Sequence, residues 1–281
     1  MVVPAPARLP LLLEELKIRA GDLIYLHTSF SRLGYLELSP DQFIDELLGY
    51  LGPQSTVVVP SFAWHLDPGA RPWKGYADYY RIRPTFDVAR TRSNIGVIPE
   101  TFRRRAGARR SLDFWWSVAA LGPLAESLTE GQEHVLEPYG PDSSFGRLHQ
   151  HGVTILALGV SLNTTSLAPV VDQALGSDHT GPLFSTRPEQ ATVIDCHGHR
   201  MTTEAYWLLP EVVRWIKPSR VIQDSGGLGG AIRRVDRGEV LHFAYSFDDY
   251  FRHGVRLGRE SMSAGRPVPW LEEYAEQSRP E

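Results

Sequence analysis

Two short apolar runs, separated by an amphipathic helix pattern, constrain the fold of this chain more than any other feature. The runs Leu23–His27 (L-I-Y-L-H) and Thr56–Pro60 (T-V-V-V-P) are typical of buried strands. Between them, Ser39–Leu51 begins with Ser and Pro, repeats apolar residues at helical spacing and is followed by Gly52, as helices commonly begin and end. A strand–helix–strand unit with short connections favours parallel strands. We therefore expect an α/β fold with a central, mostly parallel sheet flanked by helices.

The rest of the chain extends this pattern in both directions. Leu9–Ala20 predicts an amphipathic helix, Val153–Val160 a central strand, and Phe243–Leu257 a segment that ends in a helix. At 281 residues the chain can bury a large core. We expect one α/β domain over residues 1–264 and a loose C-terminal tail over residues 265–281.

The composition argues against several classes of partner. A net charge of −4 gives no basic footprint for nucleic acid or an anionic membrane, and no apolar run approaches the ~20 residues that span a bilayer. The N-terminus lacks a secretory signal pattern, and the single cysteine, Cys196, suits a reducing compartment. His197 and His199 follow it without a further ligand at metal spacing, so we expect no metal. We expect a cytoplasmic protein that binds a small molecule.

A long aromatic loop follows the second predicted strand, in Ser61–Arg83. It combines five Trp and Tyr residues with interspersed Pro and Gly: Trp64, Trp73, Tyr76, Tyr79 and Tyr80. Loops after strands commonly carry ligand-binding groups in α/β proteins. The alternative is that the rings only anchor the loop to the body of the protein. We expect Trp64 and Tyr80 to contribute to a substrate pocket.

Hydroxyl residues follow the first predicted strand. Thr28 and Ser29 come directly after Leu23–His27, in the run T-S-F-S-R-L-G. Free backbone N–H groups at such a position can hold a pyrophosphate or a carbonyl oxygen. Alternatively, Thr28 or Ser29 is the N-cap of a helix at a plain strand-to-helix turn.

An arginine cluster ends another predicted helix. The pattern of Arg92–Arg105 favours a helix that is opened by Ser93, with Gly96 against a close neighbour. The cluster Arg103–Arg105 suits the negative end of the helix dipole. The same three guanidinium groups could instead hold phosphates.

Five segments together resemble one known family. They are H-T-S-F-S-R-L-G (His27–Gly34), F-D-V-A-R-T-R-S-N-I-G-V-I-P-E-T-F-R-R-R (Phe86–Arg105), R-S-L-D-F-W-W-S-V-A-A-L-G (Arg110–Gly122), P-Y-G-P-D-S-S-F-G-R-L (Pro138–Leu148) and I-L-A-L-G-V-S-L-N-T-T-S-L (Ile155–Leu167). In order and spacing, from about Leu9 to about Ser261, the chain is similar to the aminoglycoside 3-N-acetyltransferases. The resemblance implies an antibiotic N-acetyltransferase-like fold and an acyl group transferred from acetyl-CoA, or another acyl-CoA, to an amine. It also implies coenzyme A near Thr28, Ser29, Ser93, Gly96 and Ser144.

Four histidines of the family pattern are missing here. Where that family typically reads R-S-x-H-P-x-H-S, this chain has Asp113 and Trp116 at the histidines, and the family's T-x-G-H becomes T-E-G-Q, ending at Gln132. The family's N-T-x-L-H-x-x-E holds what look like its base and partner. Ala168 stands at that histidine, and Asp172 falls one position after the glutamate. Three residues then remain as candidates for a catalytic base: Asp113, Asp172 and His27.

Asp113 has three interpretations. Beside Trp115 and Trp116 its pKa could rise enough for acid–base work near neutrality. It could also bind an acceptor ammonium whose apolar part lies on the indoles, or it could be a capping residue beside two core tryptophans. We include Trp115 and Trp116 in the expected substrate pocket, whose many rings favour a flatter ligand than a polycationic sugar.

Three functions stay open from the sequence. The first is acyl-CoA-dependent N-acylation of a small-molecule amine other than an aminoglycoside of the usual polycationic kind. The second is a repurposed biosynthetic enzyme on the same scaffold, without acetyl-CoA, that performs cyclisation, hydrolysis or other acid–base chemistry on an aromatic or cationic substrate. The third is a non-catalytic protein that binds a small molecule. The missing base disfavours the first, and the remaining polar and aromatic groups disfavour an inert relic.

Overall fold

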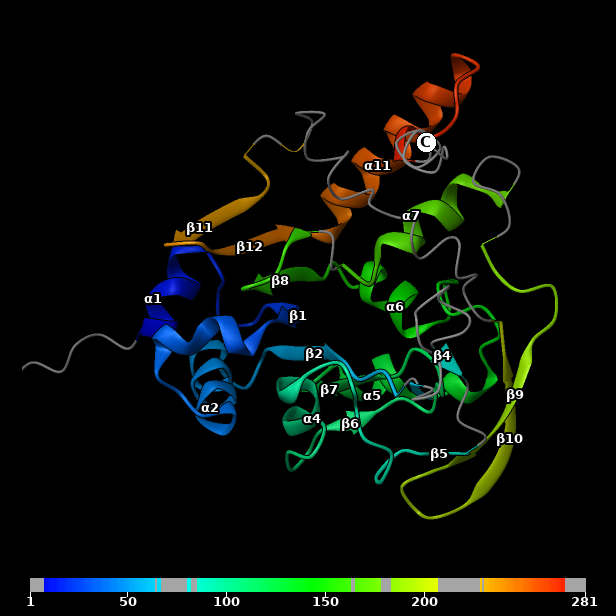
Figure 1. Ribbon diagram of the computed structural model, residues 1–281, viewed down its shortest axis with the longest axis horizontal. Helices are drawn as coiled ribbons and strands as arrows, with labels where there is room; N and C mark the ends of the chain where they lie inside the picture. The colour runs from blue at the N-terminus through cyan, green and yellow to red at the C-terminus, as the bar shows by residue number, and fades with distance from the viewer. Residues whose placement is uncertain are drawn as a thin grey trace, which may run out of the picture.

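A seven-stranded sheet forms the centre of the molecule (Figure 1). The computed structural model describes residues 8–63, 65–66, 80–81, 85–162, 165–177, 183–206, 228 and 230–270. The strands lie in the order β11 (Arg233–Arg237), β12 (Val240–Ser246), β8 (Thr154–Leu158), β1 (Leu23–Thr28), β2 (Thr56–Pro60), β7 (Val118–Leu121) and β6 (Arg109–Arg110).

The middle of this sheet is parallel. β1 pairs in parallel with β2 on one side and β8 on the other, so that Tyr25 lies opposite both Val58 and Ile155. β12 and β7 flank this unit antiparallel, and the outer strands β11 and β6 return to the first direction. The predicted α/β fold with a central, mostly parallel sheet is confirmed, because strand–helix–strand connections build its middle.

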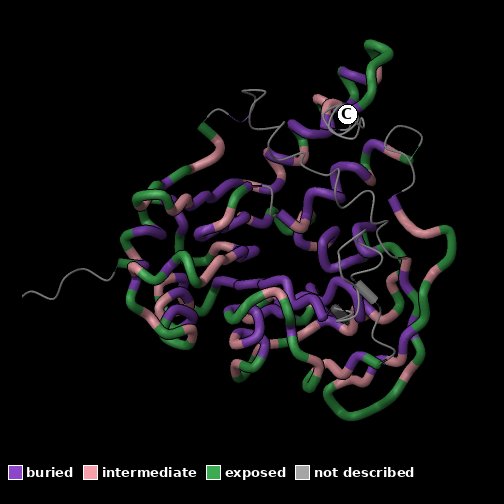
Figure 2. Tube along the Cα trace, in the orientation of Figure 1, coloured by how far each residue is buried: buried purple, intermediate pink, exposed green. Residues whose placement is uncertain are grey.

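Helices cover both faces of the sheet. On one face lie α1 (Arg8–Glu15), α2 (Pro40–Leu51) and α4 (Val97–Phe102), and on the other lie α5 (Ala125–Thr129), α6 (Ser144–Gln150), α7 (Ala168–Leu175) and α11 (Phe247–Ser263). Successive strand residues point to opposite faces, so Ile24 and Leu26 pack with the first group while Tyr25 packs with the second. Buried positions follow the strands and the inner sides of the helices (Figure 2).

A smaller sheet lies to one side of the large one (Figure 1). β5 (Thr85–Asp87) pairs in parallel with β9 (Glu189–Ile194), which pairs antiparallel with β10 (Arg200–Ala205). β9 and β10 form the hairpin expected around Gly198, whose φ of +86° favours glycine. A further pair, β3 (His65–Leu66) with β4 (Tyr80–Arg81), belongs to the aromatic loop, most of which lies outside the described residues.

Of two helix starts predicted from capping residues, that of α2 is confirmed and that of α4 is wrong. α2 begins where expected, because Ser39 and Gln42 form a reciprocal capping box. α4 begins at Val97, not at Ser93. Gly96 has a φ of +138° that no helix accommodates, and the backbone N–H of Ser93 donates to Glu100 Oε2 at 2.7 Å. Ser93 therefore belongs to a loop that precedes the helix.

The segment after α11 is packed, in contrast to the loose tail expected from residue 265. Ser261 Oγ donates to the carbonyl of Pro267 at 2.7 Å and folds the chain back at the helix end. Val268 and Trp270 are buried, with exposed fractions of 0% and 1%. Burial of two large apolar side chains shows that the packed chain continues at least to Trp270.

Candidate functional site

Most of the candidate site residues gather at one edge of the sheet. Thr28 ends β1, Ser61 follows β2, and α7 follows β8. The carboxyl ends of parallel strands share an edge, and ligands of open α/β sheets bind there. The loop before α4 reaches this edge, because the N–H of Asn94 donates to the carbonyl of Phe62 at 3.1 Å. The edge thus unites segments that are distant in the sequence.

The two hydroxyl residues Thr28 and Ser29 lie at the end of β1 and directly after it. Thr28 and Ser29 are both half-buried. Ser29 precedes the short 3-10 helix η1 (Phe30–Leu36), but its side chain makes no capping hydrogen bond there. Its Oγ lies 3.5 Å from Ser31 Oγ. The alternative role of Ser29 as a side-chain N-cap is therefore not what the structure shows.

The arginine cluster that follows α4 is already occupied. Glu100, only 8% exposed, accepts two hydrogen bonds from the Arg103 guanidinium, at 2.7 and 2.8 Å, and pairs with Arg104. Arg105 pairs with Asp41 and Asp45 of α2. The three guanidinium groups that could have held phosphates are therefore engaged in ion pairs with the protein's own carboxylates.

Ser93 and Gly96 lie beside this cluster in different ways. Ser93 is 5% exposed, and its Oγ has no hydrogen-bond partner in the part of the chain that the structure describes. Gly96 is required by its backbone conformation, since φ is +138°. Ser93 therefore retains an unused hydroxyl near the edge, whereas Gly96 needs no ligand to explain it.

Asp113 matches the capping interpretation through one carboxylate oxygen. Its Oδ1 accepts the backbone N–H groups of Trp115 and Trp116 at 2.7 and 2.8 Å. Burial raises the pKa of Asp113 to about 6, against the effect of these two hydrogen bonds, which lower it. The residue is half-buried, and both of these backbone hydrogen bonds are made by Oδ1. Its position thus has a structural explanation.

Trp115 and Trp116 pack in the hydrophobic core. They are 5% and 7% exposed. Trp116 packs edge to face on Phe62, with ring centroids 5.0 Å apart, and its ring lies 5.8 Å from that of Tyr139. That these indoles form part of a substrate pocket stays a prediction. Trp64 lies outside the described residues, and for Tyr80 only the position in β4 is described.

His27 lies next to Tyr25 on the face of β1 that meets α6. The two rings pack edge to face, with centroids 4.8 Å apart, and Tyr25 in turn lies 6.2 Å from Phe145. His27 is 7% exposed and its Nε2 has no partner among the described residues. Burial lowers the pKa of His27 to about 4. The imidazole is therefore neutral at pH 7 and is a weak base there.

Tyr25 places this pair beside the beginning of α7. Its buried hydroxyl makes no hydrogen bond of good geometry, yet the side chain of Ser166 is close enough to offset part of the rise that burial causes in the pKa of Tyr25. Ser166 comes two residues before Ala168, where α7 begins. Next to it, Thr165 Oγ1 is hydrogen-bonded to the hydroxyl of Tyr245 on β12. Polar groups from two strands and from the segment that precedes α7 therefore meet near Ala168.

Asp172 lies on α7 one turn after Ala168. Residues four apart share a helix face, so the carboxylate belongs to the face where the family pattern has histidine. Oδ1 accepts the indole N–H of Trp270 at 2.8 Å, and Oδ2 is buried without a partner among the described residues. Burial raises the pKa of Asp172 to about 7, partly offset by the hydrogen bond from Trp270. A buried carboxylate oxygen without a donor has no structural explanation.

Ser144 and Gln132 hold the beginning of α6 in place. Ser144 Oγ donates to the carbonyl of Leu128 at 2.8 Å. Gln132 Oε1 accepts the N–H of Ser144 at 2.8 Å, while its Nε2 donates to the carbonyl of Asp142 at 3.1 Å. Gln132, at a position where the family pattern has histidine, thus joins two segments of the scaffold. Ser144 is 3% exposed and its hydroxyl proton is used inside the protein.

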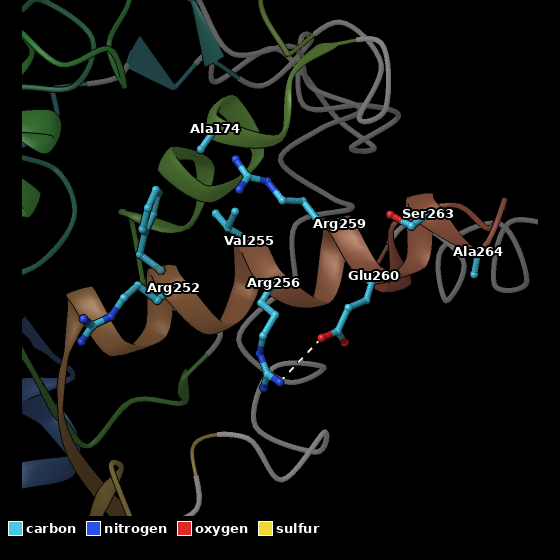
Figure 3. A pocket seen from close by; sticks show the side chains of 9 residues that line it. Ala174, Arg252, Val255, Arg256, Arg259, Glu260, Ser263 and Ala264 are labelled. Atoms are coloured by element: carbon cyan, nitrogen blue, oxygen red, sulfur yellow. Dashed lines mark ion pairs between the residues drawn. The ribbon is translucent and has the colours of Figure 1, made fainter.

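A cavity lined mainly by α11 lies apart from the candidate site residues (Figure 3). Its volume is about 790 Å³, and its wall consists of Ala174 and α11 residues including Arg252, Arg256 and Arg259. Arg252 pairs with Asp248 at 2.9 Å, and Arg256 with Glu260 at 3.6 Å. The candidate site residues are not part of this wall, so cavity size does not identify the chemistry here.

Two residues of the site escape sequence reasoning. Trp270 lies in a segment whose Pro and Gly content predicts a loose tail, although the alternation of Val268 and Trp270 is a weak signal of packing. Tyr25 is indistinguishable from a core residue of a buried strand.

In the described part of the chain, no group of three or more His, Cys, Asp or Glu side chains could hold a metal ion, and no helix is long and apolar enough to cross a membrane.

Comparisons with known proteins agree with this arrangement. A family model described as aminoglycoside 3-N-acetyltransferase matches residues 25–220. Aminoglycoside N(3)-acetyltransferase IX of Micromonospora chalcea is 34% identical over 164 residues, which are 55% of this chain and 57% of that protein. The aligned stretch therefore spans little more than half the length of that relative.

Two solved structures share the fold over most of their length. The aminoglycoside acetyltransferase AAC(3)-Xa has a TM-score of 0.71 and 26% identity, covering 89% of this chain and 90% of its own. The structure of AAC-IIIb as a binary complex with CoASH has a TM-score of 0.66 and 25% identity, covering 88% and 93%.

Proposed function

This chain belongs to the aminoglycoside 3-N-acetyltransferase family, and from that premise we propose that it transfers an acyl group from an acyl-CoA to an amine of a small molecule. The proposal rests on the environment of the Asp172 side chain. Its carboxylate has a pKa raised to about 7 and a buried oxygen without a donor, one helical turn after Ala168. A general base is most effective when its pKa lies near the working pH. Asp172 is the proposed base.

The proposed reaction balances with one base. The substrate ammonium gives a proton to Asp172 Oδ2, and the resulting amine attacks the carbonyl carbon of the thioester. The N–C bond forms, the C–S bond breaks, and the departing sulfur takes the second amine proton, which yields an amide and free CoA thiol. Asp172 then releases its proton to solvent. No covalent intermediate with the protein is required.

Two other groups assist in this proposal. Asp113 Oδ2 can accept a hydrogen bond from the acceptor's ammonium, because Oδ1 alone makes the two backbone contacts. His27 stays neutral at pH 7, since its pKa is about 4, so it can donate a hydrogen bond without carrying charge. Such a donor stabilises the negative charge that develops on the thioester oxygen.

The donor is proposed to lie against the hydroxyl groups of the sheet edge. Thr28 and Ser29 are half-buried after β1, and Ser93 Oγ is unused. Backbone N–H and hydroxyl donors of this kind bind phosphate or carbonyl oxygens. Ser144 is proposed only to support this region, through its hydrogen bonds to Leu128 and Gln132.

The acceptor is proposed to differ from a polycationic aminoglycoside. Such sugars need several ionised carboxylates, whereas Asp113 and Asp172 have pKa values raised to about 6 and about 7. The surroundings are aromatic, since Trp116 packs against both Phe62 and Tyr139. A monoamine with a flat apolar part fits this combination better.

A second candidate function follows from Ala168. A methyl group there removes the imidazole that the family pattern predicts for the base, so the scaffold could serve acid–base chemistry without acyl-CoA. Asp172 would then act on an aromatic or cationic substrate. The two candidates differ in whether the protein binds the donor.

Calorimetric titration of the purified protein with acetyl-CoA and with CoA tests the proposal. We expect micromolar binding, weakened by Ser93→Ala and unaffected by Asp172→Asn, because Asp172 contacts the acceptor. Transfer to a panel of aromatic monoamines and aminoglycosides is then measured by release of CoA thiol. Absence of binding at millimolar CoA would exclude acyl transfer and favour the second candidate. Faster turnover of aminoglycosides than of monoamines would refute the proposed acceptor class.

A further inference from the structure

Trp270 connects the C-terminal segment to the carboxylate on α7. Its indole N–H donates to Asp172 Oδ1 at 2.8 Å. Each side chain is only 1% exposed. No other side-chain donor reaches Asp172 among the described residues, and Oδ2 has no partner there. The two oxygens of this carboxylate are therefore in different situations.

We propose that Trp270 is a positioning residue that fixes the orientation of the Asp172 carboxylate and leaves Oδ2 as its one reactive oxygen. That Oδ2 reacts rests on the proposed function, whereas the pairing of the two side chains is seen directly as a hydrogen bond. Rotation about the last torsion of an aspartate is soft and roughly two-fold. A hydrogen bond to one oxygen removes that freedom and distinguishes the two oxygens.

The position of Trp270 is itself determined by α11. Ser261 Oγ donates to the carbonyl of Pro267, and the N–H of Arg266 donates to the carbonyl of Ser261 at 3.0 Å. Together these bonds fold the segment against the helix end. Trp270 is thereby connected to α7 through a packed element and not through a free tail.

The contact between α11 and α7 is close enough to transmit this position (Figure 1). A Cβ atom on Gly258 would lie 2.5 Å from Leu175 Cδ1 and 2.8 Å from Leu175 Cδ2. Leu175 is one turn along α7 from Asp172, so the two helices meet directly beside the carboxylate. An element packed without slack holds a side chain more exactly than a loop does.

Trp270 is also the neighbour that affects the charge of Asp172. The titratable or charged groups of α11 are Asp248, Asp249, Tyr250, Arg252, His253, Arg256, Arg259 and Glu260. Beside Asp172 on α7, Gln173 contacts a further one, Glu137, at 2.7 Å. None of them shifts the pKa of Asp172, which burial raises and the Trp270 indole lowers. Donation to a carboxylate favours its ionised form. Loss of the indole N–H should therefore raise the pKa further.

The variant Trp270→Phe tests the inference, because it removes the N–H and keeps most of the ring. We expect the pH at which Asp172 ionises to rise, read from the pH dependence of unfolding, and we expect this rise to vanish in an Asp172→Asn background. We also expect kcat at pH 7 to fall about tenfold or more, as for loss of a hydrogen bond to a charged group, with KM for the acyl-CoA unchanged. Tyr50→Phe is the matched control, since Tyr50 donates to the carbonyl of Ile18 at 2.9 Å far from α7.

The outcomes separate the inference from the proposed function. A rise in the pH of ionisation without any change in the pH–rate profile would support the pairing of Trp270 with Asp172 and reject Asp172 as the base. No difference between Trp270→Phe and Tyr50→Phe in either profile would overturn the inference.

A measurement on the unaltered protein covers the case in which Trp270→Phe does not fold. The NMR resonance of the Trp270 indole N–H should shift with pH as Asp172 ionises, and Asp172→Asn should abolish that shift. An indole resonance that does not titrate would also overturn the inference.

Discussion

Two buried carboxylates on opposite faces of the sheet have opposite shifts of pKa. Glu100 on α4 is 8% exposed and Asp172 on α7 is 1% exposed. Burial raises the pKa of both, but hydrogen bonds from Arg103 and from the N–H of Ser93 lower that of Glu100 below its usual value. Asp172 has one indole donor, and its pKa stays raised at about 7. Glu100 has charged guanidinium partners, whereas Asp172 is more deeply buried and has a single neutral indole donor, and both differences separate the two pKa values.

The comparison distinguishes a structural carboxylate from a reactive one. Buried polar groups in folded proteins are nearly always satisfied, and Glu100 follows this rule through Arg103 and Arg104. Groups whose pKa is strongly perturbed concentrate at functional sites. Asp172, with Oδ2 unpartnered, departs from the rule on the face that carries Ala168.

Removal of the proposed general base, Asp172, should have the greatest effect on turnover. Asp172→Asn should lower kcat by about 10²–10⁴-fold, the range for loss of a general base. Stability should stay equal or rise, since a neutral amide costs less to bury than a carboxylate. Steady-state assays with thermal unfolding measure both. Equal kcat in the variant and the unaltered protein would mean that Asp172 is not the base.

Removal of the charge of Glu100 should affect stability and leave turnover nearly unchanged. Glu100→Gln should destabilise the fold by about 3–5 kcal/mol, because it leaves the Arg103 guanidinium buried without its partner. Turnover per folded molecule should change little. Urea unfolding, with activity corrected for the folded fraction, checks this. A stable variant with lost turnover would instead assign Glu100 to the chemistry.

A pH series sharpens the comparison, because the two carboxylates predict opposite slopes. Below about pH 4, Asp172 is protonated in both the folded and the unfolded chain. Between about pH 4 and pH 7 only the unfolded chain ionises it, so the stability of the fold should decrease by on the order of 4 kcal/mol. Subtracting the profile of Asp172→Asn isolates this term. A difference that is flat from pH 4 to pH 8 would contradict the raised pKa.

Glu100 should act in the reverse direction. Its pKa is lowered in the fold, so its contribution is complete above the unfolded value of about 4.3 and is lost as the pH falls through the folded value. Subtracting the profile of Glu100→Gln below pH 5 should show this loss. Stability that is insensitive to acid in both proteins would argue against it.

The smallest expected effect sharpens the comparison at Ser93. Its backbone N–H serves Glu100 at 2.7 Å, whereas its Oγ serves no described group. Ser93→Ala should therefore change stability by less than about 1 kcal/mol and weaken acyl-CoA binding severalfold. Unfolding and calorimetry on one preparation distinguish the two. A stability loss well above that limit would place the hydroxyl in the scaffold.

The fold could be predicted from the sequence because its signals are local. The strand patterns of Leu23–His27 and Thr56–Pro60 and the capping residues of α2 each depend on a few neighbouring side chains. The boundary at Ser93 failed because Gly96 adopts a φ of +138°, a backbone choice that its neighbours do not reveal.

The candidate site was only partly predictable, since its decisive contacts are long-range. Asp172 and Trp270 are 98 positions apart, and the sequence around either residue does not predict the hydrogen bond between them. Trp115 and Trp116 were expected in a pocket, yet they are 5% and 7% exposed, because indoles that favour a ligand also favour a core. Sequence patterns give residue types near the edge, whereas burial and hydrogen bonding decide their roles.

Gly258 has a consequence for how tolerant this chain is to random change. The absent side chain allows α11 to approach Leu175 on α7, and even a methyl group would meet that leucine at 2.5 Å. In a genetic screen for inactive variants, codon 258 should therefore recur beside those of the sheet edge, although it encodes no functional group. Its lesions should be partly suppressed by a second change of Leu175 to a smaller residue, which would restore the spacing between the two helices.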